Sequence, residues 1–269
     1  MFLTIQATFR RNYLVMRHSL PYTSIIGSLL SGFYMILFSY LIYKIMFNGK
    51  LDDSFIKYTG SSDYITFAVL GSTVYILSIS VLLIVSRSLI SELRQGTLET
   101  IFLSPASRQG YFLGCMLQGL MLVGIEFIGI LVMGFFFGLD ITNINPISAS
   151  ITLVLIIFSF YSQALVLGAI MVWFRDTYIT QNTLITLMGL ISGVSFPIEY
   201  LPDWLQYLSK IMPLTFGLVA FRETIMLGGE LVSSFESISY LIMLTTCYFL
   251  IGKYLLIKVE KNILEKITE

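Results

Sequence analysis

The 269 residues are 56% hydrophobic and only 12% charged, with a mean hydropathy of +0.85, which is typical of a membrane protein with several spans and excludes an ordinary soluble domain. Lys plus Arg and Asp plus Glu number 16 each, so no excess of positive charge points to nucleic acid as a partner. The single histidine and the two cysteines, Cys115 and Cys247, which both fall inside apolar runs, leave almost no material for a metal site or a disulfide.

An amphipathic segment over residues 1–22 begins the chain. Apolar residues recur every three or four positions along one face: Phe2, Ile5, Phe9, Tyr13, Met16 and Leu20. The opposite face carries Thr4, Thr8, Arg11 and His18. This pattern predicts a helix that lies in the membrane interface, with its arginines near lipid phosphates.

Residues 23–269 form one predicted membrane domain. A helix needs roughly 20 apolar residues to span a bilayer. Six segments are long enough: 24–43, 64–86, 111–139, 147–173, 177–196 and 238–257. The sequence therefore predicts an all-α membrane protein with six spans.

A polar segment over 88–104 separates the second and third spans. As a helix it places these residues on one face: Ser88, Glu92, Gln95, Gly96 and Glu99. Gly96 removes a side chain in the middle of that face and so permits a close approach, and Pro105 ends the helix. We expect a helix outside the bilayer that presents Glu92 and Glu99 to a partner; the alternative is a solvated charged loop.

Glu126 carries the carboxyl group that lies well inside a predicted span, the third one at 111–139. Ionisable groups in a membrane are costly and usually face a polar interior or a partner. Glu126 could make a structural hydrogen bond or subunit contact, line a pathway, or relay protons. Gln118 and Gln163 are its candidate partners.

Three of the six prolines, Pro197, Pro202 and Pro213, interrupt the region 197–229 between the fifth and sixth spans. They divide it into apolar pieces, 200–212 and 214–227, that are too short to span a bilayer. Irregular backbone at membrane depth survives only where protein buries it or where it lines a water-filled cavity. We expect a re-entrant helical pair that forms the exit of a pathway, with Trp204 at the membrane interface.

The distribution of basic residues predicts the orientation. With a cytoplasmic N-terminus, that side would carry most of the Arg and Lys residues near the spans, and the opposite side would carry an acidic cluster that includes Asp52, Asp53 and Asp203. The positive-inside rule therefore predicts that both termini lie in the cytoplasm.

Three motifs resemble those of ABC-2 type transporter permeases, in the same order along the chain. The first is E-x-x-x-G-T-L-E from Glu92 to Glu99, and the second is Arg175-Asp176 after the fourth span. The third is the proline-punctuated series Phe196-Pro197, Leu201-Pro202-Asp203-Trp204-Leu205 and Met212-Pro213-Leu214-Thr215-Phe216. In that family a short helix after the second span docks on a separate ATPase. The resemblance implies a set of ATPase-coupling residues: Glu92, Gln95, Gly96, Thr97, Glu99, Arg175 and Asp176.

The resemblance also implies partners and a function. The chain has no G-x-x-x-x-G-K-[ST] motif for binding ATP, so two copies of a separate ATPase subunit would hold ATP and Mg, and the chain itself would need no cofactor. A second permease copy and membrane lipid are the other expected partners.

The expected function is export of an amphiphilic cargo, such as a drug, peptide, lipid or lipid-linked glycan, across the cell membrane. The N-terminal helix would be an anchor or an ATPase contact. The alternative function is a six-span membrane enzyme or sensor without an ATPase partner.

Overall fold

The computed structural model describes residues 1–19, 22–46, 49, 51–175 and 179–268, and these residues form helices and no strand. The helices are α1 Phe2–Ser19, α2 Tyr22–Leu41 with its continuation Ile42–Met46, α3 Asp53–Thr59, α4 Tyr64–Gln95, α5 Leu98–Leu103, α6 Arg108–Phe137, α7 Pro146–Phe174, α8 Ile179–Ile191, the short turn Ile198–Tyr200, α9 Asp203–Ser209, α10 Pro213–Met226 and α11 Phe235–Thr268. The predicted all-α fold is confirmed.

Five of the described helices are long and apolar enough to cross a membrane: Ile25–Ile45, α4, α6, α7 and the Phe235–Glu265 part of α11. They correspond to the first, second, third, fourth and sixth predicted spans. α4 and α7 are largely buried inside the chain, whereas α2, α6 and α11 mostly expose their apolar surfaces. The core therefore lies between α4 and α7, and the other three helices surround it.

The predicted fifth span, 177–196, differs from the structure. Its described part is helical only from Ile179 to Ile191, 13 residues, which is about 20 Å of helix against a hydrocarbon core of about 30 Å. Residues 177 and 178 lie outside the described part of the chain. The helix stops because Gly193 has a φ of +75°, in the left-handed region that ends helices, and Pro197 follows. The continuous helix to residue 196 is therefore wrong.

The predicted single helix over 88–104 is also wrong. α4 continues without a break from the second span to Gln95, and Gly96 then ends it with a φ of +70°. The amide of Thr97 donates to the carbonyl oxygen of Glu92 at 3.0 Å, which closes the last turn. A separate helix, α5, begins at Leu98. Gly96 therefore acts as a helix stop between two helices, and not as a flat point on the face of one helix.

The prolines of the 197–229 region begin its pieces, as expected. Pro197 precedes the short turn at Ile198, Pro202 precedes α9, and Pro213 is the first residue of α10. A proline suits the first turn of a helix because that position needs no amide donor. α9 and α10 have 7 and 14 residues, so neither is long enough to cross a bilayer alone.

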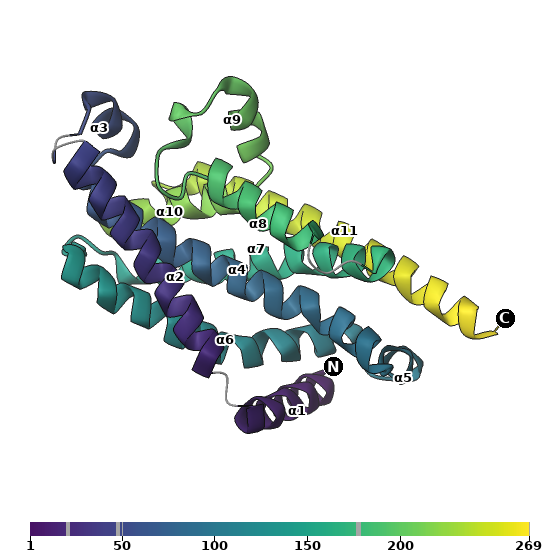
Figure 1. The fold of residues 1–269 in the computed structure, drawn as a ribbon. Coiled ribbons are helices and arrows are strands. Elements are labelled where there is room, and N and C mark those ends of the chain that lie inside the picture. Colours follow the sequence, from purple (N-terminus) through teal and green to yellow (C-terminus); the bar gives the residue numbers. More distant parts are fainter. Residues whose placement is uncertain (20–21, 47–48, 50, 176–178, 269) are drawn as a thin grey trace.

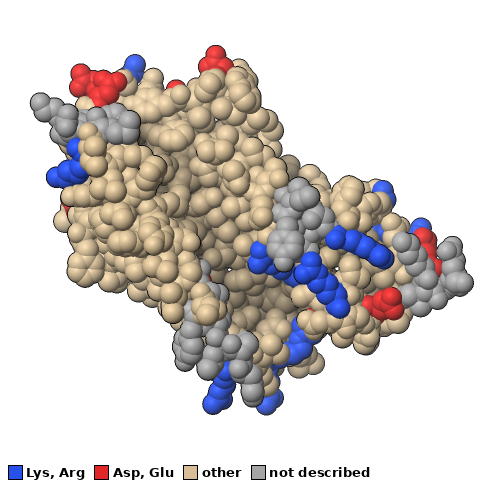
Figure 2. All heavy atoms as spheres, viewed as in Figure 1, with Lys and Arg blue, Asp and Glu red and all other residues tan. Residues whose placement is uncertain are grey.

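The long helices run between two opposite ends of the molecule (Figure 1). One end carries α3 and α9, and the other carries α5 and the C-terminus, with α1 lying beside it. On the face drawn in Figure 2, Lys and Arg gather toward the end with α1, α5 and the C-terminus, Asp and Glu cap the end with α3 and α9, and the middle is almost without charge. This uncharged middle is what a membrane-crossing body requires.

Candidate functional site

The turn between α4 and α5 forms a polar corner at one end of the molecule. The exposed residues of this corner are Gln95, Gly96, Thr97, Glu99, Thr100 and Leu103, and we call this set the α4–α5 corner. Leu103 is 67% exposed and is the large apolar side chain of the set. Inside the corner, Leu98 and Phe102 are buried and hold α5 against the body. The corner is therefore a supported surface and not a solvated loop.

Glu92 does not face outward as the sequence predicted. Its residue is only 4% exposed, and its carboxylate accepts hydrogen bonds from Arg11, Thr97 and Tyr111. The distances are 2.5 Å from Arg11 Nη2 and 3.0 Å from the Tyr111 hydroxyl. Because α4 continues to Gln95, its last turn points Glu92 toward α1 and α6. Glu92 therefore joins α4 to α1, α6 and the turn before α5 instead of presenting its charge to a partner, which corrects the prediction for this residue.

Arg11 on α1 completes this buried network. Burial lowers the pKa of its guanidinium, but the hydrogen bond and the negative charge of Glu92 raise it by more, so the pKa lies above its ordinary value. The guanidinium carbon also lies 5.8 Å from the centre of the Tyr111 ring. Arg11 is thus a permanent cation that ties α1 to the last turn of α4.

α1 packs on α6 through two glycines one turn apart, Gly110 and Gly114. A methyl group added to Gly110 would lie 3.0 Å from the Thr4 side chain, and one added to Gly114 would lie 2.7 Å from the Thr8 side chain. Small residues four apart let two helix backbones approach closely. The face that packs on the protein is therefore the polar face predicted from Thr4 and Thr8.

Arg175 ends α7 in the left-handed conformation, with a φ of 53°. Its side chain and that of Glu99 line the same groove, about 340 Å³, between α5, α7 and α11. The structure thus brings these two predicted coupling residues together, although they are 76 positions apart. Asp176, the other residue of that predicted pair, lies outside the described residues.

Glu126 is 6% exposed and accepts a hydrogen bond from the Ser80 hydroxyl of α4 at 3.0 Å. The partners expected from the sequence were Gln118 and Gln163, but the Gln118 amide instead lies 3.1 Å from the sulfur of Met16. Glu126 therefore ties α6 to α4. A structural hydrogen bond, one of the roles considered above, is what the described contacts give it.

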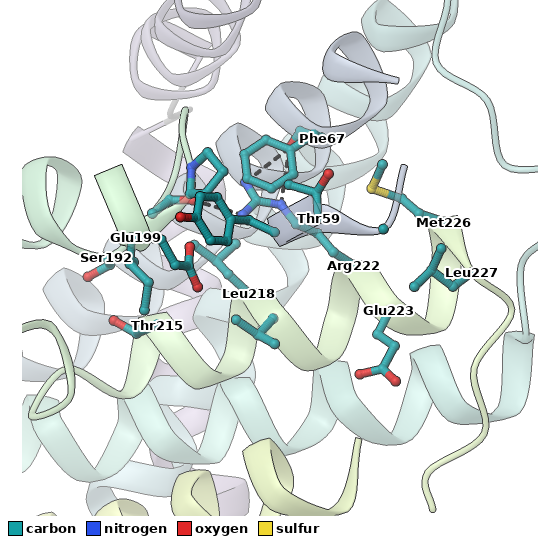
Figure 3. Close-up of a pocket in the computed structure, with 16 residues that line it drawn as sticks. Thr59, Phe67, Ser192, Glu199, Thr215, Leu218, Arg222, Glu223, Met226 and Leu227 are labelled. Atoms are coloured by element: carbon teal, nitrogen blue, oxygen red, sulfur yellow. Dashed lines mark hydrogen bonds between the residues drawn. The ribbon is translucent and has the colours of Figure 1, made fainter. Parts of the chain in front are cut away.

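A second site, a pocket of about 280 Å³, lies at the opposite end between the α3 region, α4 and α10 (Figure 3). Arg222 of α10 lies against it and is 8% exposed. Its guanidinium donates to the carbonyl oxygens of Phe67 at 3.0 Å, Gly193 at 2.8 Å and Val194 at 2.6 Å. It also lies under the Phe67 ring, 3.4 Å from the ring centre, while Glu223 points away from it.

Arg222 explains how the non-helical backbone after α8 is tolerated. The carbonyls of Gly193 and Val194 have no helical partners there, and a buried carbonyl without a donor is costly. The planar fork of arginine supplies several donors at once. The sequence analysis gave Arg222 no structural role; an arginine inside an apolar piece of a membrane protein is itself the signal of a buried polar role.

The predicted residues of the exit region are not all gathered at this pocket. Pro197 lines it, whereas Pro202 and Pro213 begin helices outside its lining. Trp204 of α9 is 63% exposed and also lies outside it. The region is therefore a cap of short helices with a pocket on its inner side.

Comparison with known proteins supplies the family. No curated protein matches the chain. The family model described as ABC-2 type transporter matches residues 4–226, which include most of α1, the helices α3, α5 and α9, and four of the five candidate spans. The chain therefore belongs to the ABC-2 type transporter family, as a multi-pass membrane transport subunit that is not itself catalytic.

Proposed function

We propose that this chain is the permease of an ATP-driven exporter and that a separate ATPase subunit docks on the α4–α5 corner. The exposed, supported corner is the observation that carries the proposal. The corner carries the polar groups of Gln95, Thr97 and Glu99 and the exposed apolar side chain of Leu103, a combination suited to an interface with an apolar anchor and polar contacts. The family match supports an ATPase as the occupant.

The shape of α4 supports a rigid coupling mechanism. This helix runs for 32 residues from Tyr64 to Gln95 without a break, and most of its spanning part is buried in the core. At the far end the carbonyl of Phe67 binds Arg222, beside the second pocket. A displacement of the corner would therefore move the helix as a body and reach the pocket at the other end.

We further propose that the end with α5 and the two termini faces the cytoplasm, where ATP is. Two permease copies and two ATPase copies would form the complex in the cell membrane. The charge distribution of Figure 2 supports this orientation through the positive-inside rule. The cargo would be amphiphilic and would leave by the α3–α9 end. Arg175 and Asp176 remain predicted ATPase contacts.

The test is recovery of the ATPase with the permease. Replacing Glu99 by Lys and Leu103 by Asp changes the charge and removes the anchor of the corner without altering a span. Loss of an interfacial charge pair typically costs about 2–5 kcal/mol, so we expect the double variant to recover at least tenfold less ATPase and to lose cargo-stimulated ATP hydrolysis.

Glu236→Lys is the matched control, because Glu236 is exposed in the first turn of α11, remote from the corner. It should bind the ATPase as the wild type does. Wild-type ATPase recovery and wild-type stimulation in the Glu99→Lys, Leu103→Asp variant would show that the corner is not the docking site.

A further inference from the structure

Two adjoining hollows lie where the end of α7 meets α11. The first, about 250 Å³, has Ile170, Trp173, Phe174, Leu255, Lys258 and Val259 in its lining. The second is the groove of about 340 Å³ described above, whose lining includes Glu99, Trp173, Arg175, Val259 and Asn262. Because Trp173 and Val259 line both, the hollows form one continuous depression on the surface of two candidate spans.

The first hollow has apolar walls and one charged group at its edge. Phe174 is 70% exposed and Trp173 is 45% exposed, so large apolar side chains at its mouth are open to the surroundings over much of their surface. The Lys258 ammonium lies 5.2 Å from the centre of the Trp173 ring. A lysine beside a tryptophan is typical of the boundary between the hydrocarbon core and the lipid headgroups.

The second hollow contains a residue in an unfavourable backbone conformation. Among the described residues, Arg175 is the one non-glycine residue with a positive φ. That conformation is costly for a residue with a Cβ atom, and such strain often accompanies a functional site. It ends α7 so that the Arg175 side chain lines the groove together with Asn262, which can donate hydrogen bonds.

The charges that line the depression favour an anion. Arg175 and Lys258 contribute two positive charges and Glu99 one negative charge, which leaves one positive charge in excess. A ligand that fits must have an apolar chain for the first hollow and an anionic group that can reach both cations. A phospholipid of the surrounding bilayer has both parts.

We propose that this depression binds an anionic phospholipid from the leaflet at the α5 end, with its phosphate held by Arg175 and Lys258 and an acyl chain against Ile170, Phe174 and Leu255. The lipid is a bound component of the permease and not its cargo, so the proposal goes beyond the proposed function. Since Glu99 lines the same groove, the bound headgroup touches the α4–α5 corner and joins it to α7 and α11.

The two tryptophans of the chain provide the measurement. Trp204 lies on α9, at the opposite end from Trp173, so Trp204→Phe leaves Trp173 as a single fluorescent probe inside the depression. The full-length permease, without any ATPase, is placed in phosphatidylcholine vesicles in which increasing fractions of the lipid are replaced by chain-brominated phosphatidylglycerol. Chain-brominated phosphatidylcholine is the comparison. Bromine quenches the fluorescence of a tryptophan that it contacts.

We expect quenching by the brominated phosphatidylglycerol to saturate at a low mole fraction, while the brominated phosphatidylcholine quenches only in proportion to its amount. High salt should weaken the quenching by brominated phosphatidylglycerol and leave the quenching by brominated phosphatidylcholine unchanged. Removal of each cation should raise the phosphatidylglycerol fraction needed for half-quenching about fivefold, as expected for one basic residue near an anionic headgroup. Equal quenching by the two brominated lipids would overturn the proposal.

Variants of Arg175 separate the charge from the backbone conformation. Arg175→Gly favours the left-handed conformation and removes the cation, whereas Arg175→Lys keeps the cation. We expect Arg175→Gly and Lys258→Gln each to weaken the preference for phosphatidylglycerol by this fivefold shift, their double variant to lose it, and Arg175→Lys and Lys258→Arg to keep most of it. Lys210→Gln, at the opposite end, is the control. An unchanged preference in the Arg175→Gly, Lys258→Gln variant would show that these residues do not hold the headgroup.

Discussion

Arg222 joins three parts of the chain that are far apart in sequence. Its hydrogen bonds reach Phe67 on α4 and the backbone of Gly193 and Val194 after α8, 155, 29 and 28 positions away. Hydrogen bonds to a charged group contribute about 1.5–3 kcal/mol each, more than ordinary ones. Arg222 therefore stabilises the packing of α10 on α4 and the end of α8 together.

Replacement of Arg222 should destabilise the protein strongly. Arg222→Gln cannot reach three carbonyls, and Arg222→Lys lacks the planar fork, so each should lower the free energy of unfolding by roughly 3 kcal/mol or more. We expect a fall in the melting temperature of the detergent-solubilised permease, with Arg222→Lys closer to Arg222→Gln than to the wild type. Lys210→Gln, an exposed cation nearby in sequence, should leave the melting temperature unchanged.

Gly71 on α4 allows a test of how closely α4 packs against Arg222 and the turn after α8. A methyl group at this position would lie 2.0 Å from the Val194 carbonyl oxygen and 2.2 Å from Arg222 Nη2. Gly71→Ala should therefore destabilise the protein although it adds only one methyl group, whereas Gly27→Ala should not, since a Cβ atom there has no neighbour within 4 Å. Equal melting temperatures for the two variants would contradict the close contact.

At the residue scale, the sequence indicated which residues matter better than it indicated what they contact. It singled out Glu92 and Arg175, and both lie at the end that carries α5. It could not predict that Glu92 faces inward, because this depends on α4 continuing unbroken from the second span to Gln95, which fixes the direction of the Glu92 side chain relative to the core. It also depends on Arg11, which comes from a helix 81 positions earlier.

At the scale of elements, α1 is held by surface shape as much as by charge. Its Thr4 and Thr8 lie against Gly110 and Gly114, and the Arg11–Glu92 pair closes the same contact from the side. Arg11 is half-exposed but Glu92 is buried, so the pair compensates a carboxylate that would be costly to bury alone. Both the packing on the two glycines and this ion pair therefore hold α1.

Gly114→Val should displace α1 from α6. The larger side chain would overlap the Thr8 side chain and the Ile5 carbonyl oxygen, which lie 2.7 and 2.9 Å from the added carbon. The native thiols are first removed by Cys115→Ala and Cys247→Ala. Thr4→Cys on α1 and Ser107→Cys at the start of α6 then provide a pair of thiols. In the parent protein, Ser107 N and Thr4 Oγ1 are 3.4 Å apart. A short bifunctional thiol reagent should crosslink this pair several-fold less in Gly114→Val.

Gly124→Val is the control for that experiment, because Gly124 lies on the same helix with no neighbour within 4 Å of an added carbon. It should leave the yield of crosslinked protein unchanged. Undiminished crosslinking in Gly114→Val would mean that α1 does not depend on the glycine surface.

The elements that the sequence predicted correctly are those defined by length and hydropathy, the five long helices. The elements it predicted wrongly end inside an otherwise helical pattern. Gly96 and Gly193 both take a left-handed conformation, and a glycine in a helical pattern can equally well continue the helix. Hydropathy reports how far apolar residues continue, not whether the backbone stays helical, so the end of α8 could not be found from it.

For the whole molecule, the main observation is that, on the face drawn in Figure 2, the two ends differ in charge across an almost uncharged middle. If the α5 end faces the cytoplasm, a thiol at Thr100 of α5 should be hidden from an impermeant reagent in intact cells, while thiols at Asp53 of α3 and Asp203 of α9 should react. All three positions are exposed in the chain, so differences in labelling report the side of the membrane.

Thr100→Cys should then react once the cells are permeabilised, which shows that the thiol itself is accessible. The reverse pattern, with Thr100→Cys labelled in intact cells and Asp53→Cys and Asp203→Cys protected, would invert the orientation. The ATPase could not then reach the α4–α5 corner.

The contacts of Arg222 also have a consequence for the synthesis of the chain. The ribosome releases α4 and the turn after α8 before α10, so the carbonyls of Gly193 and Val194 emerge ahead of their donor, which follows 29 and 28 positions later. α10 then brings the guanidinium to acceptors that are already made. A chain that stops before α10 would keep this turn without its donor, which is costly at membrane depth.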